Sequence, residues 1–193
     1  MAVRFHGSRS AMALAPLACI LFILLYLVAM SQDPGYTFLE NYLSDLGVGP
    51  GAWAFNSALM IAGATLSLFA VFGLSGALPA EPVSRTGAAL LALAGAFLVN
   101  VGIFTEDAGD LHLILSYAFF ITIFTSFGVL TLAMHRDRRL GPVPLYVTGG
   151  LFLCGLVMIL SLGATPFMET LAVLMVMGWG IVVPGAILTK PDG

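Results

Sequence analysis

Six long stretches without a charged side chain divide this sequence, and they constrain its fold more than any other feature. The stretches cover residues 10–32, 46–80, 86–105, 111–135, 140–168 and 170–189. Each reaches the roughly 20 residues that an α-helix needs to cross the hydrocarbon core of a bilayer. Charged residues make up only 9% of the 193-residue chain, against about 25% in soluble domains. The sequence therefore predicts an all-α, polytopic integral membrane protein, a bundle of six transmembrane helices in a single domain, 1–193.

The predicted spans cover residues 11–31, 53–77, 86–105, 111–134, 143–163 and 168–189. The first span follows two arginines, as a secretory signal peptide would. Its apolar core is longer than the roughly 7 to 15 residues of such peptides, so we expect it to be retained. Pro16 and Pro184 lie within spans, where a missing N–H group favours a kink.

Charged residues alternate between the connections. All the basic residues lie before the first span, in the second and fourth connections, or after the last span: Arg4, Arg9, Arg85, Arg136, Arg138, Arg139 and Lys190. The other connections hold only acids: Asp33, Glu40, Asp45, Glu106, Asp107, Asp110 and Glu169. Basic loops stay in the cytoplasm. We therefore predict a multi-pass protein of the cell membrane with both termini cytoplasmic and the acidic connections outside.

The first acidic connection contains apolar residues at helical spacing: Phe38, Leu39, Tyr42, Leu43 and Leu46. Gly47 is a suitable helix stop. This pattern predicts a short amphipathic helix lying in the outer membrane interface. Asp45 would then lie near the C-terminal end of that helix, where a carboxylate opposes the helix dipole and needs another partner.

Polar residues from several elements are expected at the same depth below the outer surface. Asn56 lies near the start of the second span and Asn100 about one turn below the end of the third. His112 and Ser116 are four residues apart, and so on one face of the fourth span. We predict a shared ligand-binding pocket formed by Ser44, Asp45, Asn56, Asn100, Asp107 and His112.

The alternative interpretation is structural. The asparagines and Ser116 would then form interhelical hydrogen bonds, and the loop acids would be solvated. We expect solvation for four acids in particular: Asp33, Glu40, Glu106 and Glu169.

The acidic connections contain no Lys or Arg, so their carboxylates lack a counter-charge. A cationic ligand or a divalent metal would supply one. The candidate metal ligands are Asp45, Asp107, Asp110 and His112, although "EDAGDLH" matches no standard metal signature. If a reaction is catalysed, His112 is the candidate general base and Asp45 its partner. Ser116 is the candidate nucleophile, although a serine one turn from a histidine usually only shares a hydrogen bond with it.

Three segments carry a family resemblance as a set: "YLSDLGVGPGAWAFN", "VGIFTED" and "LHLILSYAFF". They resemble the prokaryotic six-helix membrane proteins classed as domain of unknown function 998. That group is distantly similar to the eukaryotic DRAM-like and Frag/Sfk membrane proteins, which include autophagy modulators and a factor of GPI-anchor lipid remodelling. An "ISD" segment and a histidine opening the fourth span recur there. They match Leu43-Ser44-Asp45, with Leu in place of Ile, and His112. The resemblance implies the fold and, by analogy, work on lipids.

Three functions remain open. The first is a lipid-handling protein, with or without a lipid-modifying reaction, whose polar pocket holds a lipid head group or a metal. The second is a scaffold or sensor whose basic "HRDRR" loop contacts anionic lipid or a cytoplasmic partner. The third, a transporter of a small solute or cation, is disfavoured because no charged residue lies at the middle of a span.

The expected partner is membrane lipid. Nucleic acid is excluded because the few basic residues form no extended surface. The third span, "TGAALLALAGAF", is rich in small residues that let helices approach closely within the bundle. Homo-oligomerisation through such faces is the alternative.

Overall fold

The computed structural model describes residues 8–161 and 165–189. Within these ranges the chain forms helices and no β-strand. Six helical segments are long and apolar enough to cross a membrane, which confirms the predicted six-helix architecture. The predicted end of the fifth span, at residue 163, and both chain ends lie outside the described residues. The cytoplasmic orientation of the termini stays a prediction.

The long helices begin and end within a few residues of the predicted limits. In chain order the elements are α1 (Ser8–Met12), α2 (Leu14–Gln32), η1 (Leu43–Gly47), α3 (Ala52–Leu68), η2 (Phe69–Leu74), α4 (Ser75–Ala77), α5 (Pro82–Ile103), η3 (Glu106–Ala108), α6 (Asp110–Arg136), η4 (Arg138–Leu140), α7 (Pro142–Ser161) and α8 (Pro166–Leu188). When α3, η2 and α4 are taken as one continuous span, Ala52–Ala77, the largest difference is at α5, which starts four residues early because Pro82 occupies its first turn, where no N–H donor is needed.

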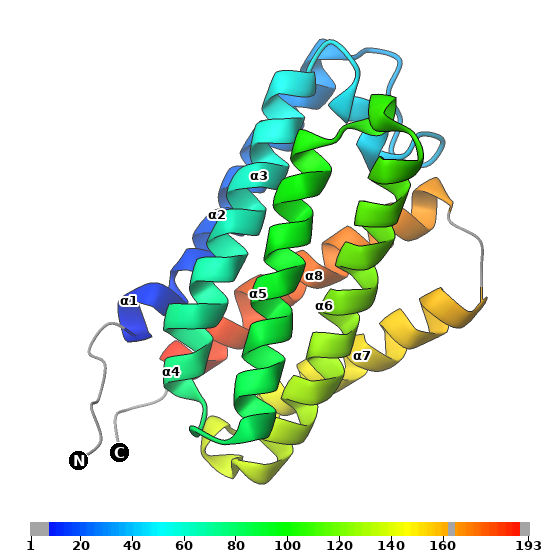
Figure 1. Cartoon of the computed structure of the whole chain (residues 1–193). Coiled ribbons are helices and arrows are strands. Elements are labelled where there is room, and N and C mark those ends of the chain that lie inside the picture. Colours follow the sequence, from blue (N-terminus) through cyan, green and yellow to red (C-terminus); the bar gives the residue numbers. More distant parts are fainter. Residues whose placement is uncertain (1–7, 162–164, 190–193) are drawn as a thin grey trace.

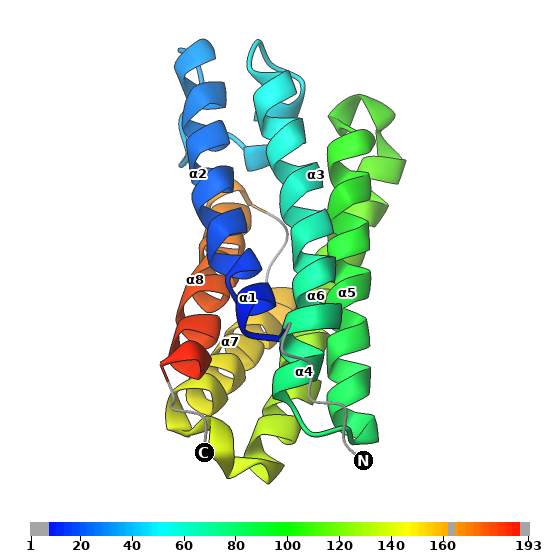
Figure 2. The same cartoon turned by 90° about the vertical axis from the view of Figure 1, so that its left-hand side faces the viewer.

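Each long helix packs against the next one along the chain, and α8 also packs against α2. Figure 1 shows α2, α3, α5 and α6 running nearly side by side, with α7 and α8 inclined to them. Figure 2 shows α1 and α2 beside α8. The connections 33–51 and 104–109 lie together at one end of the bundle, which we call the acidic end. The start of α5, which contains Arg85, and the end of α6, which contains Arg136, lie at the opposite end.

The first span is interrupted near the predicted proline kink. Pro16 has no N–H group for the carbonyl of Met12, and its ring crowds that carbonyl. Helix α1 accordingly ends at Met12 and α2 begins at Leu14. At the break, the N–H of Ala13 donates to the carbonyl oxygen of Ser10 at 3.2 Å. Pro184, by contrast, lies inside α8 without ending it.

The centre of the bundle is built around Trp179 of α8, which is almost fully buried. Its ring lies 4.8 Å from that of Phe127 and 6.0 Å from that of Phe69, measured between centroids. Phe69 belongs to η2, a π-helical turn that continues α3. The indole Nε1–H donates to Thr148 Oγ1 at 2.9 Å, so the one polar atom of the ring is satisfied.

Small residues let α3 and α5 approach closely. A Cβ atom added to Gly63 would lie 2.5 Å from the carbonyl oxygen of Gly95, and one added to Gly95 would lie equally near that of Gly63. Ser67 in the same contact donates to the carbonyl oxygen of Ala92 at 2.9 Å. These residues therefore pack within one chain, and oligomerisation through small-residue faces stays a prediction.

The first acidic connection contains the predicted short helix, but that helix is a 3₁₀ turn of five residues, η1. Leu43 and Leu46 of this turn are buried, whereas Phe38 and Leu39, which precede it, are 51% and 59% exposed. The amphipathic pattern therefore extends over fewer residues than predicted. The buried leucines anchor the connection to the acidic end of the bundle.

Candidate functional site

Asp45 stabilises the start of η1. Its Oδ2 accepts hydrogen bonds from the backbone N–H of Tyr42 at 3.1 Å and from Nδ2 of Asn41 at 3.2 Å. η1 ends at Gly47 as predicted but begins only at Leu43, so Asp45, the third of its five residues, lies in the first turn as well as near the C-terminal end. In the first turn a carboxylate complements the helix dipole.

Glu169, in the first turn of α8, ties this connection to the bundle. Its Oε2 accepts the backbone N–H of Leu43 at 2.6 Å, across 126 positions of the chain. The adjoining end of α8 is capped by Thr165, whose Oγ1 accepts from the N–H of Met168 at 3.3 Å. The hydrogen bond from Leu43 to Glu169 joins the first turn of α8 to the first residue of η1. Glu169 therefore fixes where η1 sits over α8.

Glu106 joins the same group from η3. Ser44 Oγ donates to Glu106 Oε1 at 3.1 Å. Burial raises the pKa of the Glu106 carboxyl above its ordinary value, and the neighbouring Asp45 carboxylate raises it further; the hydrogen bond from Ser44 and the proximity of His112 act in the opposite direction. Carboxylates from two connections are thus close enough to repel each other.

His112 is held in one orientation at the start of α6. Its side chain is 9% exposed, and Nδ1 lies 2.7 Å from the carbonyl oxygen of Phe104. A carbonyl can only accept, so Nδ1 carries the proton. In the neutral ring Nε2 then presents a lone pair. Ser116 Oγ lies 3.4 Å from Nε2, a long hydrogen bond in the geometry expected for two residues one turn apart.

These side chains border a cavity of about 420 Å³ between α6, α7 and α8. Its polar part is formed by Tyr42, Ser44, Glu106, His112, Ser116 and Glu169. Its apolar part is formed mainly by Leu113, Tyr117, Phe120, Ile121, Phe124, Met158, Ile159, Met168 and Ala172. A volume of 300 to 1,000 Å³ is usual for small-molecule sites. The cavity is therefore large enough for a ligand with both a polar and an apolar part.

The cavity borders the outside of the bundle as well as its interior. Leu113, Ile121 and Ile159 line it and are about half exposed on the surface of their helices, at 51%, 48% and 46%. These positions belong to helices that are apolar enough to span a membrane. Hydrocarbon outside the bundle can therefore reach the apolar part of the cavity.

Several residues of the predicted pocket do not line this cavity. Asn56 donates from Nδ2 to the carbonyl oxygen of Gly47 at 2.8 Å and thereby holds the end of η1. Asn100 donates to the carbonyl oxygen of Ala96, one turn back along α5. Asp107 and Asp110 are exposed. Asp45 contributes indirectly, through its interaction with Glu106.

The candidate metal ligands Asp45, Asp107, Asp110 and His112 are not brought together. Among the residues that the structure describes, no group of three or more His, Cys, Asp or Glu side chains could hold a metal ion. The acidic end therefore gives no geometric support to the predicted divalent metal.

Glu106 and Glu169 were expected to be solvated, but the structure places both in partly buried positions. Each lines the cavity and accepts a hydrogen bond from the η1 segment. One signal in the sequence pointed to Glu169, because it is the only charged residue between Leu140 and Lys190. A lone acid at the start of a span is expensive unless it is paired or functional.

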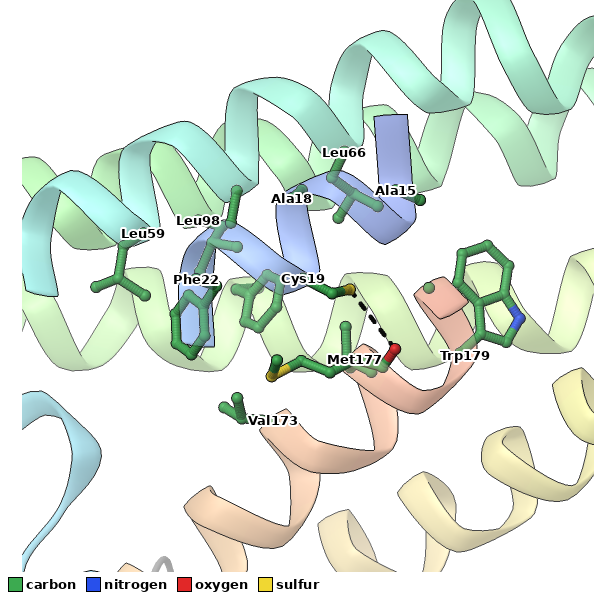
Figure 3. Close-up of a pocket in the computed structure, with 14 residues that line it drawn as sticks. Ala15, Ala18, Cys19, Phe22, Leu59, Leu66, Leu98, Val173, Met177 and Trp179 are labelled. Atoms are coloured by element: carbon green, nitrogen blue, oxygen red, sulfur yellow. Dashed lines mark hydrogen bonds between the residues drawn. The ribbon is translucent and has the colours of Figure 1, made fainter. Parts of the chain in front are cut away.

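A second, smaller cavity lies deeper in the bundle and is almost wholly apolar. Its volume is about 80 Å³, and Figure 3 shows Cys19 and Phe22 of α2 facing Val173 and Met177 of α8 across it. The thiol of Cys19 lies 3.6 Å from the carbonyl oxygen of Met177. This cavity offers packing space but no group for recognising a ligand's polar part.

Comparison with known proteins identifies the family. A family model described as "Protein of unknown function (DUF998)" matches residues 16–186, which include all six spans apart from a few terminal residues. The chain belongs to the DUF998 family. It is a multi-pass membrane protein by the length and hydropathy of its six long helices. No curated protein matches this DUF998 chain, and no solved structure does either. The predicted distant similarity to DRAM-like proteins is not confirmed.

Proposed function

We propose that this DUF998 protein binds a single amphiphilic lipid in the cavity at the acidic end. The polar head would lie among Ser44, Glu106, His112, Ser116 and Glu169. The alkyl chain of the lipid would lie along the apolar wall formed by α6 and α7. The observation that carries the proposal is that one cavity joins these two kinds of wall.

The dimensions support an alkyl chain in this position. His112 and Phe124 both line the cavity and are twelve residues apart on α6. At a rise of 1.5 Å per residue this places them about 18 Å apart along the helix axis. The apolar wall therefore leads from the end of the span toward the middle of the membrane, in the direction that lipid chains take. Access from the bilayer past Ile121 and Ile159 would spare the chain a passage through water.

Photochemical cross-linking tests the proposal. A monoacylglycerol with a diazirine in its chain would be incorporated into phosphatidylcholine nanodiscs with the full-length protein. We expect labelling to concentrate on the cavity-lining residues of α6 and α7. Ser116→Phe, which places a ring at the junction of the polar and apolar parts, should reduce this labelling several-fold.

Thr125→Phe is the matched control, because Thr125 is on the same helix but exposed and outside the cavity. It should leave the labelling unchanged. Uniform labelling of all lipid-facing helices, insensitive to Ser116→Phe, would contradict the proposal.

A lipid-modifying reaction is the second candidate function, and the orientation of His112 favours it. With its proton on Nδ1, the ring can accept a proton at Nε2 from a hydroxyl group or water in the cavity. His112→Gln keeps a side-chain N–H donor for the carbonyl of Phe104 but removes this base. If catalysis occurs, the variant should retain lipid labelling and lose release of fatty acid from the bound monoacylglycerol. Equal release by both proteins would exclude His112 as the base.

A further inference from the structure

The cavity at the acidic end is lined by two acidic side chains and, among the residues that the structure describes, by no Lys or Arg. Glu106 and Glu169 line it. Asp45 is not part of the lining, but it is close enough to Glu106 for the two carboxyl groups to interact electrostatically. Every Lys and Arg of the sequence lies near a terminus, in the first turn of α5, or at or just after the C-terminal end of α6. The start of α5, which contains Arg85, and the end of α6, which contains Arg136, are at the other end of the bundle (Figure 1). A cleft lined by charge of one sign concentrates ligands of the opposite sign.

We propose that the ligand of this cavity is a cationic amphiphile, an alkyl chain whose head group is a protonated amine. The inference rests on the proposed function, because it assigns the charge of the head group to a lipid site already argued from shape. Two independent features support it: the apolar wall accounts for the chain, and the carboxylates account for the cation.

The arrangement of the acceptors suits an ammonium group. Hydrogen bonds from the η1 segment reach both lining acids: Oε1 of Glu106 accepts from Ser44, and Oε2 of Glu169 accepts from Leu43. An ionised carboxylate has about four acceptor sites, so each acid can also accept from a bound N–H. Ser116 Oγ adds a neutral acceptor on the α6 side. An alkylammonium carries three donors and needs several acceptors spread around it.

Other head groups fit less well. A phosphate or sulfate would be repelled by the lining acids and would meet no Lys or Arg in the acidic connections. A metal ion needs converging ligands within about 2.6 Å of one point, and no metal-binding group of three or more His, Cys, Asp or Glu occurs among the residues of 8–161 and 165–189. Burial and the neighbouring Asp45 carboxylate raise the pKa of Glu106, and a bound cation would lower it again.

Three amphiphiles of equal chain length separate the contributions of the head group and the chain. Dodecylamine, dodecanol and dodecyl sulfate would be titrated into the full-length protein in neutral detergent, and bound adducts counted by native mass spectrometry at neutral pH. We expect dodecylamine to bind about tenfold more tightly than dodecanol, because charge-assisted hydrogen bonds are stronger than neutral ones. Dodecyl sulfate should bind more weakly than either.

Substitution of the lining acids tests the origin of the preference. Glu106→Gln should reduce the affinity for dodecylamine about fivefold or more and leave dodecanol binding unchanged. Glu169→Gln should do the same, and Glu106→Gln alone decides the matter if the Glu169 variant does not fold. Asp107→Asn is the matched control, since it removes an exposed charge from the same connection outside the cavity.

The outcomes distinguish the inference from the proposed function. Equal binding of the amine and the alcohol, or an amine preference that survives Glu106→Gln, would overturn the cationic head group and leave the lipid site intact. Failure of all three amphiphiles to bind would overturn both. An equal effect of Asp107→Asn would show that the preference arises from overall surface charge, and would also overturn the inference.

Discussion

Two buried polar regions of this bundle differ in how their polar atoms are satisfied. At the centre, Trp179 donates to Thr148, and Ser126 donates to the carbonyl oxygen of Gly87 at 2.9 Å. These groups are uncharged, and the bonds are made within the protein. At the acidic end, Glu106 and Glu169 line an open cavity and only part of their bonding capacity is used by η1.

The difference separates polar groups that hold the structure from groups that are available to a ligand. A buried neutral pair rigidifies a core and leaves nothing to recognise. A partly buried carboxylate without a Lys or Arg partner raises the free energy of the unliganded folded protein, and a bound cation would lower it. The same helices, α6 and α8, contribute to both regions. Function would therefore be concentrated at one end of a bundle whose centre provides the stability.

Truncation of Trp179 should cause the largest loss of stability. Trp179→Ala removes two aromatic contacts and leaves a cavity in the centre, and we expect a cost of about 3 to 5 kcal/mol in the free energy of unfolding. Trp53→Ala is the control because Trp53 is 60% exposed. Denaturant titration in detergent measures both. Similar losses in the two variants would contradict the stabilising role assigned to the centre.

Loss of the central hydrogen bond should have a smaller effect. Thr148→Val keeps the shape of the side chain but leaves the indole N–H of Trp179 without its acceptor. A buried donor without a partner costs about 1 to 3 kcal/mol. Amphiphile binding at the acidic end should not change in this variant. A loss of binding in proportion to the loss of stability would show that the two regions are not independent.

Removal of Glu169 should loosen η1 more than it destabilises the bundle. In Glu169→Ala the N–H of Leu43 loses its acceptor, and its hydrogen exchange should accelerate by about tenfold, as expected for one hydrogen bond. Amides near Trp179 should retain their protection. Asp107→Ala should leave the Leu43 amide unchanged. Unaltered exchange at Leu43 in Glu169→Ala would show that the carboxylate does not hold the connection in place.

The smallest expected effect is a dependence of stability on pH. The folded protein raises the pKa of Glu106, so the folded state binds this proton more tightly than the unfolded state does. The contribution of Glu106 to stability is therefore fully present below its ordinary pKa and is lost as pH rises through the raised value. Glu106→Gln should make thermal stability less sensitive to pH in that window. An equally steep loss in the variant would assign the effect to other groups.

The number of spans could be predicted because uncharged stretches of sufficient length admit few other structures in a membrane. The contact between His112 and Ser116 could also be predicted, since it depends only on helical spacing. The hydrogen bonds of Glu106 and Glu169 to the η1 segment could not be predicted from the sequence. Whether a loop acid is solvated depends on which segment folds over it, and the contact between Leu43 and Glu169 joins opposite ends of the chain.

The asparagines illustrate a second limit of sequence analysis. Asn56 lies near the start of α3 and Asn100 near the end of α5, but a side chain at either position can face any direction around its helix. Asn56 bonds to the carbonyl of Gly47, and Asn100 to that of Ala96. The rotation of each helix in the bundle is set by packing contacts such as that between Gly63 and Gly95, which single-sequence patterns do not specify.

A crystal structure grown in a lipidic mesophase with 12-bromododecylamine would test the central claim most directly. Bromine can be located by its anomalous scattering independently of how the chain is interpreted. The account predicts a bromine peak beside Phe124 and Met158, with the amine toward Glu106 and Glu169. A peak found only on the outer, membrane-facing surface, with no amphiphile density in the cavity, would contradict it.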